Sequence, residues 1–235
     1  MLSIRDLDVY IQASHILRRL SLDVGPDEVV CLVGRNGAGK TTLLRTIMGY
    51  LRPRAGSISF KGAGIHGRPT HEIAREGIGF APEDSGIFAD LTVAENIEIS
   101  TWTRTTGRAA AARIEGAYAV FPVLRNYAAR KGPEMSGGER KMLSIARALA
   151  LDPELLLLDE PFEGLSPAII PAVTDGIASI TRLGHGILIA ESNIHHVPDF
   201  AARLYVIERG EIIFAGRPEE AHRDAAVLRV IGGAA

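Results

Sequence analysis

Short runs of apolar residues recur along the chain, with turns and helical segments between them. Apolar runs of four or five residues bounded by turn residues are typical of strands buried on both faces of a sheet. We expect such strands at about 29–33, 57–60, 78–81, 155–158, 187–190 and 204–207. Helices are expected at about 40–51 and 168–183. This alternation predicts an α/β fold with a mainly parallel sheet.

The middle of the chain has a different pattern. From about 92 to 151 the signals are helical, with an alanine-rich stretch at 109–118. Ser136 is followed three residues later by Glu139, which is the spacing of a capping box at the start of a helix. We therefore expect a helical subdomain inserted into the α/β domain.

Composition narrows the classes of protein to which the chain can belong. With 26 basic and 28 acidic residues among 235, the net charge is −2, which provides no basic field for nucleic acid. The single cysteine, Cys31, excludes an intramolecular disulfide framework and a cysteine-rich metal site. The apolar runs are too short to span a membrane, and the first residues lack the pattern of a secretory signal. The mean hydropathy of +0.12 predicts a large core or an apolar surface that meets a partner.

A glycine-rich segment after the first apolar run carries candidate chemistry. It fits G-x-x-x-x-G-K-[ST] at every fixed position, between an expected strand and an expected helix. Its glycines let backbone N–H groups face phosphate oxygens, Lys40 would reach the β- and γ-phosphates, and the Thr41 hydroxyl would bind Mg²⁺. A chance glycine-rich turn is the alternative. The candidate ATP-binding residues are Gly34, Arg35, Asn36, Gly37, Ala38, Gly39, Lys40, Thr41 and Thr42.

Lysine is scarce in this chain. The four lysines are Lys40, Lys61, Lys131 and Lys141, and all other basic residues are arginines. Since an ammonium and a guanidinium differ in geometry and hydration, each position that keeps lysine is a candidate for a specific role. Lys40 has such a role in the loop above, whereas Lys141 only follows Ser136 on the expected helix.

Two carboxylates end the apolar run at 155–158. A buried strand would deliver Asp159 at its tip, where it can hold Mg²⁺, and the adjacent Glu160 can accept the proton of an attacking water. Alternatively, both acids cap a loop or the next helix. Together with the loop at Lys40, they favour phosphoryl transfer.

A second anion-binding turn makes the pattern more specific. Ser136, Gly137, Gly138 and Glu139 open a helix, whose N-terminal N–H groups bind anions. With the two segments above, this turn resembles the signature motif of ATP-binding cassette ATPases. A plain capping box is the alternative, and it explains only the helix start. In that family two cassettes dimerise head to tail, and each ATP lies between one phosphate loop and the opposite signature.

The resemblance covers nearly the whole chain and implies the fold of that family. This is a P-loop NTPase fold with a mainly parallel core sheet, an N-terminal antiparallel β element and an inserted helical subdomain. It implies one ATP-binding domain, with a core subdomain at 1–84 and 153–235 and a helical subdomain at 85–152. Tyr10 lies where the family places an aromatic ring that stacks on adenine, and a half-buried strand tyrosine is the alternative.

Several stretches resemble the LivF-type subunit of branched-chain amino acid importers. They are 34–42 with 46–49, 69–75, 77–80, 87–88, 91–96 and 163–167. Urea-type subunits share much of this, including 121–124. The resemblance implies a bacterial ATPase, peripheral to the cytoplasmic face of the inner membrane, that energises uptake of branched-chain or other hydrophobic amino acids. A urea, amide or other small-solute importer is the alternative.

The resemblance also implies partners. These are a second cassette, either a different chain or another copy, two transmembrane permease subunits and, indirectly, a periplasmic or extracellular solute-binding protein. No nucleic acid is expected. Ile87, Phe88 and Leu91 are candidates for permease contact, and packing inside the helical subdomain is their alternative role.

Three positions depart from the general pattern of the family. Glu83 stands where most cassettes have glutamine, although the branched-chain type tends to have glutamate, and a carboxylate still binds Mg²⁺. Ser166 replaces the aspartate of the D-loop, and Ser192 replaces the switch histidine, whose cationic form serine cannot imitate.

These departures predict an asymmetric pair of cassettes. The chain's own site, with Lys40, Glu83, Glu160 and Ser192 in the catalytic positions and Thr41, Asp159 and Glu83 as Mg²⁺ ligands, would bind MgATP and hydrolyse it slowly. Its signature would complete a faster site on the partner.

Two other classes of protein, and two substitutes for the switch histidine, are alternatives to this interpretation. A soluble cassette of DNA repair or translation usually carries tandem cassettes or long coiled-coil insertions, for which 235 residues leave no room. A non-catalytic nucleotide-binding regulator is suggested by Ser192 and disfavoured by Glu160. His195 and His196 are candidate substitutes for the switch histidine, with a surface or packing role as the alternative.

Overall fold

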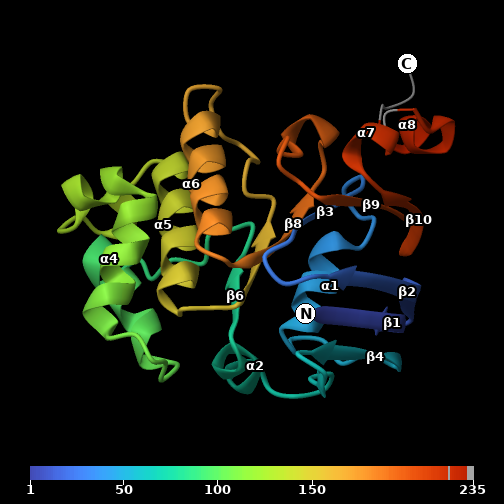
Figure 1. The fold of residues 1–235 in the computed structure, drawn as a ribbon, viewed down its shortest axis with the longest axis horizontal. Helices are drawn as coiled ribbons and strands as arrows, with labels where there is room; N and C mark the ends of the chain where they lie inside the picture. Colours follow the sequence, from blue (N-terminus) through green and yellow to red (C-terminus); the bar gives the residue numbers. More distant parts are fainter. Residues whose placement is uncertain (222, 232–235) are drawn as a thin grey trace. The chain divides into compact units, whose positions relative to one another are not determined.

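The computed structural model describes residues 1–221 and 223–231, and its chain divides into two compact units. Unit 1 comprises Met1–Ile73 and Gly186–Ala235, and unit 2 comprises Ala74–His185. Each unit combines strands with helices (Figure 1).

An antiparallel sheet forms the N-terminal part of unit 1. It contains β1 (Leu2–Ile11), β2 (Ser14–Val24), β4 (Ala55–Phe60) and β5 (Ala63–Gly64) in the order β2-β1-β4-β5. β1 and β2 form a hairpin whose register places Tyr10 opposite His15. This sheet confirms the expected N-terminal antiparallel element.

The other strands of unit 1 comprise the strand predicted at 29–33 and the strands that lie beside it. β3 (Val29–Val33) lies between β8 (Gly186–Glu191) and β9 (Arg203–Glu208) and is parallel to both, while β10 (Glu211–Gly216) is antiparallel to β9. All five residues of β3 are buried, as its continuous apolar run predicts. The remaining elements are α1 (Lys40–Ile47), η4 (Ile194–His196), α7 (Pro218–Ala221) and α8 (Ala225–Ile231), and α2 (Thr70–Glu76) crosses into unit 2.

Helix α1 ends earlier than expected. The sequence predicts a helix to about residue 51, but α1 ends at Ile47, and Gly49 has a φ of 77°. A Cβ at Gly49 would lie 2.4 Å from the carbonyl oxygen of Arg68. A left-handed glycine just beyond the last turn is a common helix stop, and here a tertiary contact also requires it.

Unit 2 contains two parallel strands and most of the helices. β6 (Ile78–Ala81) pairs with β7 (Leu155–Asp159). The helices are α3 (Val93–Glu98), α4 (Ala110–Val120), α5 (Gly137–Ala150) and α6 (Ile170–Arg182), with short 3₁₀ turns η1 (Ile99–Trp102), η2 (Pro122–Tyr127) and η3 (Gly132–Glu134). α5 packs against α4 (Figure 1) and also against α3, and α4 contacts α6. The middle of the chain is therefore helical, as its pattern predicts.

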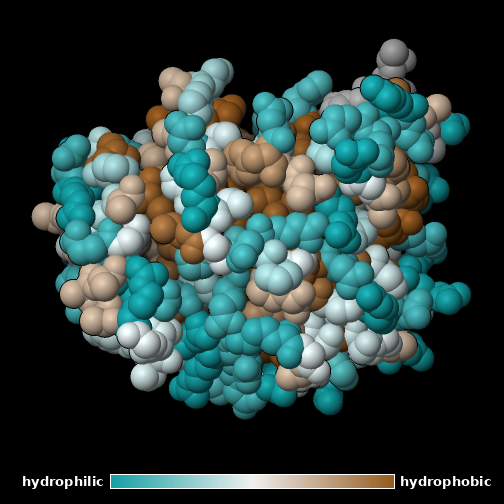
Figure 2. Space-filling view, in the orientation of Figure 1, coloured by the Kyte–Doolittle hydropathy of each residue, from teal (hydrophilic) through white to brown (hydrophobic). Residues whose placement is uncertain are grey.

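The apolar content of the chain is largely internal. β3, β7 and β8 are buried along their whole length. Hydrophobic residues also reach the surface among hydrophilic ones on the face drawn in Figure 2. Trp102 is 74% exposed, and Tyr50 and Leu183 are each 59% exposed. Among the described residues, no helix has both the length and the apolar character needed to cross a bilayer.

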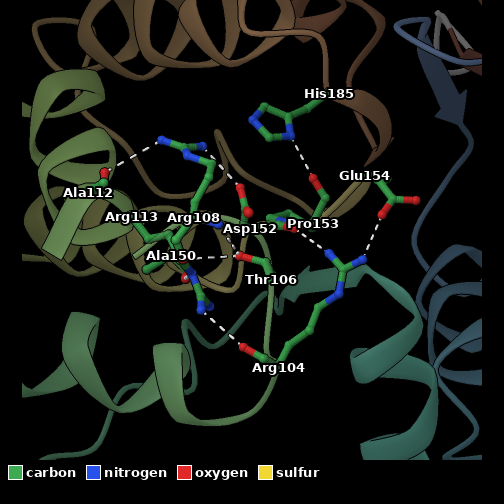
Figure 3. Close-up of polar contacts among 10 residues, drawn as sticks. All are labelled: Arg104, Thr106, Arg108, Ala112, Arg113, Ala150, Asp152, Pro153, Glu154 and His185. Atoms are coloured by element: carbon green, nitrogen blue, oxygen red, sulfur yellow. Dashed lines mark hydrogen bonds and ion pairs between the residues drawn. The ribbon is translucent and has the colours of Figure 1, made fainter. Parts of the chain in front are cut away.

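A cluster of arginines fixes the segment that leads into β7 (Figure 3). The buried Arg113 donates from Nε to the carbonyl oxygen of Ala150 at 2.9 Å, and from its Nη1 to those of Thr101 and Arg104 at 3.2 and 3.0 Å. Arg104 in turn donates to the carbonyl oxygen of Asp152 at 2.5 Å. Nearby contacts at the same segment are Arg104 with Glu154, Arg108 with Asp152, and His185 Nδ1 with the carbonyl oxygen of Pro153.

We expect Arg113→Met to lower the free energy of unfolding by about 3 kcal/mol, because it leaves buried carbonyl oxygens without a donor. The measurement is urea unfolding followed by circular dichroism. Arg125→Met is the matched control, since Arg125 forms an exposed ion pair with Glu115. Equal stability of the two variants would show that the buried contacts of Arg113 contribute nothing.

Candidate functional site

The loop between β3 and α1 follows a path that depends on glycine. Its first residue, Gly34, donates its N–H to the carbonyl oxygen of Glu191 at 3.1 Å, and a Cβ there would lie 2.3 Å from the carbonyl oxygen of Ile207. Gly39 has a φ of 116°, and a Cβ there would lie 2.7 Å from the side chain of Leu17. Any side chain at these two positions would displace the loop.

Lys40 is buried beneath this loop. The residue is only 5% exposed, and its Nζ donates a hydrogen bond to the carbonyl oxygen of Gly34 at 2.7 Å. Arg35, Asn36 and Gly37 form the exposed crest, while Ala38 and Gly39 are buried and Thr41 and Thr42 half-buried. A buried ammonium next to an exposed glycine-rich backbone is an arrangement suited to an anionic ligand with several phosphates.

Tyr10 lies in a pocket of unit 1. Of the residues that line this pocket, only Tyr10 was selected from the sequence. Its ring stacks on His15 with a centroid distance of 4.1 Å and an interplanar angle of 7°. The guanidinium of Arg54 lies 5.0 Å from the centroid of the same ring, and His15 Nε2 contacts Asp8 at 2.7 Å. These residues line a pocket of about 560 Å³. The hairpin register, which pairs Tyr10 with His15, is the signal that could have revealed this pair.

Ser192 and the two histidines also belong to unit 1. Ser192 is half-buried and directly follows β8. His196 Nδ1 lies 3.3 Å from Oε2 of the fully buried Glu191, and the backbone N–H of the exposed His195 donates to Asn193. His196 is therefore partly engaged with Glu191, and the structure gives His195 a surface position.

The two carboxylates at the end of the apolar run at 155–158 belong to unit 2. Asp159 ends β7 and is 2% exposed, and Glu160 is 4% exposed. Glu160 has a φ of 47°, in the left-handed region that non-glycine residues rarely occupy. Such strained residues cluster at functional sites, where the surrounding structure holds them in place.

More acidic groups surround Glu160. Burial raises the pKa of Glu163, and the charges of Glu83 and Glu160 raise it further, whereas the ammonium of Lys141 opposes this shift. The exposed Glu83 is held through its carbonyl oxygen, which accepts a hydrogen bond from Lys141 Nζ at 2.6 Å. Sequence reasoning selected Glu83 and Glu160 but assigned no role to Glu163 or Lys141.

The turn at the start of α5 is a complete capping box. Ser136 Oγ accepts from the N–H of Glu139 at 3.3 Å, and Glu139 Oε2 accepts from the N–H of Ser136 at 2.7 Å. Burial acts to raise the pKa of Glu139, but the hydrogen bonds from Ser136 and Tyr127 and the charge of Arg130 lower it overall. Ser136 and Gly137 are exposed, so the turn presents its backbone to solvent.

The candidate residues thus fall into two sets. Unit 1 holds the loop at Lys40, the Tyr10 pocket and Ser192, and unit 2 holds Glu83, the acids after β7 and the turn at Ser136. Within the described residues, no three His, Cys, Asp or Glu side chains form a metal-binding group. Mg²⁺ does not require one, because it commonly takes one or two carboxylates together with substrate phosphates and water. The hydroxyl of Thr41 and the carboxylates of Asp159 and Glu83 have the oxygen donors that it prefers.

Comparison with known proteins decides the family. Residues 17–163 match the model of the family described as ABC transporter. The chain belongs to this ABC transporter family. Like its relatives, this cassette binds ATP and hydrolyses it to drive transport. It also has the cassette fold expected from sequence, with an N-terminal antiparallel sheet and a mixed, mainly parallel core sheet with helices.

Two curated relatives of this cassette serve different transport systems. BraG of Pseudomonas aeruginosa, a high-affinity branched-chain amino acid transport ATP-binding protein, is 37% identical, with 91% of each chain covered. LptB of Haemophilus influenzae, a lipopolysaccharide export system ATP-binding protein, is 36% identical over 94% of this chain and 92% of its own. Among solved structures, the cassette MJ1267 in its ADP conformation has a TM-score of 0.85 and 25% identity, covering 100% of this chain and 99% of that chain.

We expect Tyr10→Ala to weaken ATP binding by the cassette about tenfold, because stacking of a base on an aromatic side chain contributes about 1–3 kcal/mol. The dissociation constant is measured by titration with a fluorescent ATP analogue. Tyr50→Ala, at a 59% exposed tyrosine of the same unit, is the matched control and should bind normally. Normal binding by the Tyr10 variant would leave this tyrosine a strand residue only.

Proposed function

We propose that this cassette is the ATP-hydrolysing subunit of an importer for branched-chain or other hydrophobic amino acids, of the LivF type. The observation that carries the proposal is the buried Lys40 under a complete phosphate-binding loop, in a chain 37% identical to a branched-chain amino acid transport ATPase. The loop and Lys40 support ATP binding, and the similarity to BraG supports branched-chain amino acids as the transported solutes.

Residues of the loop at 34–42 and residues at the end of β7 would have different roles in binding and hydrolysing ATP. Backbone N–H groups of 34–42 and the ammonium of Lys40 would hold the phosphates, and Tyr10 would support the base. Mg²⁺, held by Thr41, Asp159 and Glu83, would neutralise charge on the phosphates. Glu160 would orient a water and take its proton, with its side-chain position fixed by burial and by the strained backbone.

The cassette would work on the cytoplasmic face of a bacterial inner membrane with other subunits. These are a second cassette, two permease subunits and, indirectly, a solute-binding protein. We keep the division into a core subdomain at 1–84 and 153–235 and a helical subdomain at 85–152. Phe88 is 48% exposed, whereas Ile87 and Leu91 are half-buried, so Phe88 is the strongest of these candidates for permease contact.

The pair of cassettes would be asymmetric. Ser192 lacks the imidazole that could donate to the γ-phosphate as a cation, and the exposed Ser166 lacks the carboxylate of the usual D-loop. The turn at Ser136, by contrast, keeps the residues of the family's signature motif. This chain would therefore contribute fully to ATP hydrolysis at the partner's site and hydrolyse ATP slowly at its own.

Lipopolysaccharide export is a second candidate function. It is favoured by the 36% identity to LptB over 94% of this chain, which nearly equals the identity to BraG. Purification with the native membrane subunits and reconstitution in liposomes separates the two. Leucine with a solute-binding protein would stimulate ATP hydrolysis by an amino acid importer, and lipopolysaccharide would stimulate an exporter.

In the assembled transporter, Glu160→Gln in this chain alone should leave MgATP binding intact and reduce hydrolysis at its own site by at least about 100-fold, since general-base catalysis contributes that much. Total turnover should fall only partly, because the partner's site continues. Phosphate release measures both, and Glu134→Gln at an exposed acid of unit 2 is the control. Complete loss of turnover would show that this chain's site is not the weaker one.

Ser136→Ala should lower both stability and ATPase activity, whereas Thr92→Ala should lower stability alone. Both residues cap helices of unit 2 in capping boxes, so each substitution costs about 1 kcal/mol. Only Ser136 lies in the signature turn. Urea unfolding and steady-state ATP hydrolysis are compared for the pair, and equal activities would argue against a nucleotide role for Ser136.

A further inference from the structure

The loop between β6 and α3 is held by α5 at its first part. This loop spans residues 82–92 and includes Glu83. Lys141, 6% exposed, extends from the second turn of α5 and donates to the carbonyl oxygen of Glu83 at 2.6 Å. The two residues are 58 positions apart in the sequence. A charged donor on a carbonyl acceptor forms a strong and directional hydrogen bond.

The next part of the loop is held by the same helix. Arg147 donates to the carbonyl oxygen of Gly86 at 2.5 Å, and its guanidinium lies 5.3 Å from the ring centroid of Phe88. Ser85 and Gly86 have φ values of 65° and 51°, so two successive residues adopt the left-handed conformation there.

The last part of the loop is held by α3. The fully buried Asn96 accepts from the N–H of Phe88 at 2.8 Å and donates to the carbonyl oxygens of Phe88, Leu91 and Thr92 at 3.0, 3.2 and 2.9 Å. The loop therefore has partners along its length although it lacks regular secondary structure. Such a loop moves as part of the helices that hold it.

The Lys141 contact joins two segments that face nucleotide in the proposed function. Glu83 would belong to the set around the chain's own ATP, and Ser136, which caps α5, would face the partner's ATP. Lys141 is five residues from Ser136, so about 7.5 Å of helix separates them at about 1.5 Å per residue. Glu163 lies close enough to Glu83, Glu160 and Lys141 for their charges to act on its carboxyl group.

We propose that Lys141 is a positioning residue that locks the Glu83 loop to the signature helix, so that nucleotide bound at the chain's own phosphate loop shifts the signature turn. The inference rests on the proposed function. Lys141 touches neither ATP nor the reacting water in this role, and it acts through the main chain of Glu83. Removal of its donor should disconnect the two segments and leave each of them folded.

The test uses hydrogen exchange of the full chain, diluted until light scattering shows a monomer, with the non-hydrolysable analogue AMP-PNP and Mg²⁺. In the monomer only the chain's own loop binds the analogue. For the wild type we expect slower exchange at 34–42, 82–91 and 136–141. For Lys141→Met, which keeps length and burial, we expect the first two responses and loss of the third. Lys141→Gln is measured alongside, so that the result does not depend on the folding of one variant.

Lys131→Met, at an exposed lysine of the same unit, is the matched control and should respond like the wild type. Lys141→Arg keeps a charged donor and should restore the response at 136–141. In steady-state hydrolysis by the assembled transporter, Lys141→Met should lower kcat about tenfold and change KM for ATP less than about twofold.

Two results would overturn the inference. One is a wild-type response at 34–42 without any at 136–141, and the other is a full response at 136–141 in both Lys141→Met and Lys141→Gln. Either leaves the proposed function standing. Absence of any response at 34–42 in the wild type contradicts nucleotide binding itself, and the inference fails with it.

Discussion

Buried lysine and arginine side chains that donate to main-chain carbonyl oxygens recur in both units of this cassette. Lys40 binds the carbonyl oxygen of Gly34, Lys141 that of Glu83, and Arg113 that of Ala150. Burying a cation is costly unless its donors are satisfied, and carbonyl dipoles satisfy them without adding a competing charge. The candidate functional segments that these bonds hold are mostly loops, which lack the regular backbone hydrogen bonds of a helix or sheet.

Two non-glycine residues of the candidate segments have strained backbone conformations. Glu160 and Ser85 both have positive φ values, which cost about 1–3 kcal/mol each when the residue is not glycine. The segment before β7 is fixed by Arg104, so the strand enters the sheet at one defined position and delivers Asp159 and Glu160 at its end. Rigid surroundings of this kind keep catalytic groups in place without the help of substrate.

Local signals predicted much of this structure, and long-range contacts were out of reach. The phosphate loop, the apolar strand at 29–33 and the capping box at Ser136 each involve residues close in sequence, so their patterns were sufficient. The early end of α1 depends on the approach of Arg68 to Gly49, and the role of Lys141 depends on a partner 58 residues away. No periodicity or propensity carries information on such pairs. The Tyr10–His15 stack lies between these cases, because a correct hairpin register would have predicted it.

The acceptor of Lys141 has a consequence for the residue beside it. Since the bond ends on the main-chain oxygen of Glu83, this bond does not depend on which side chain occupies position 83. Glutamate, glutamine or another polar residue could occupy position 83 while its Cα stays in place. The fold thus fixes the position of this residue independently of its side-chain chemistry. In the proposed function, substitutions at position 83 would change the affinity for a divalent cation without rebuilding the scaffold.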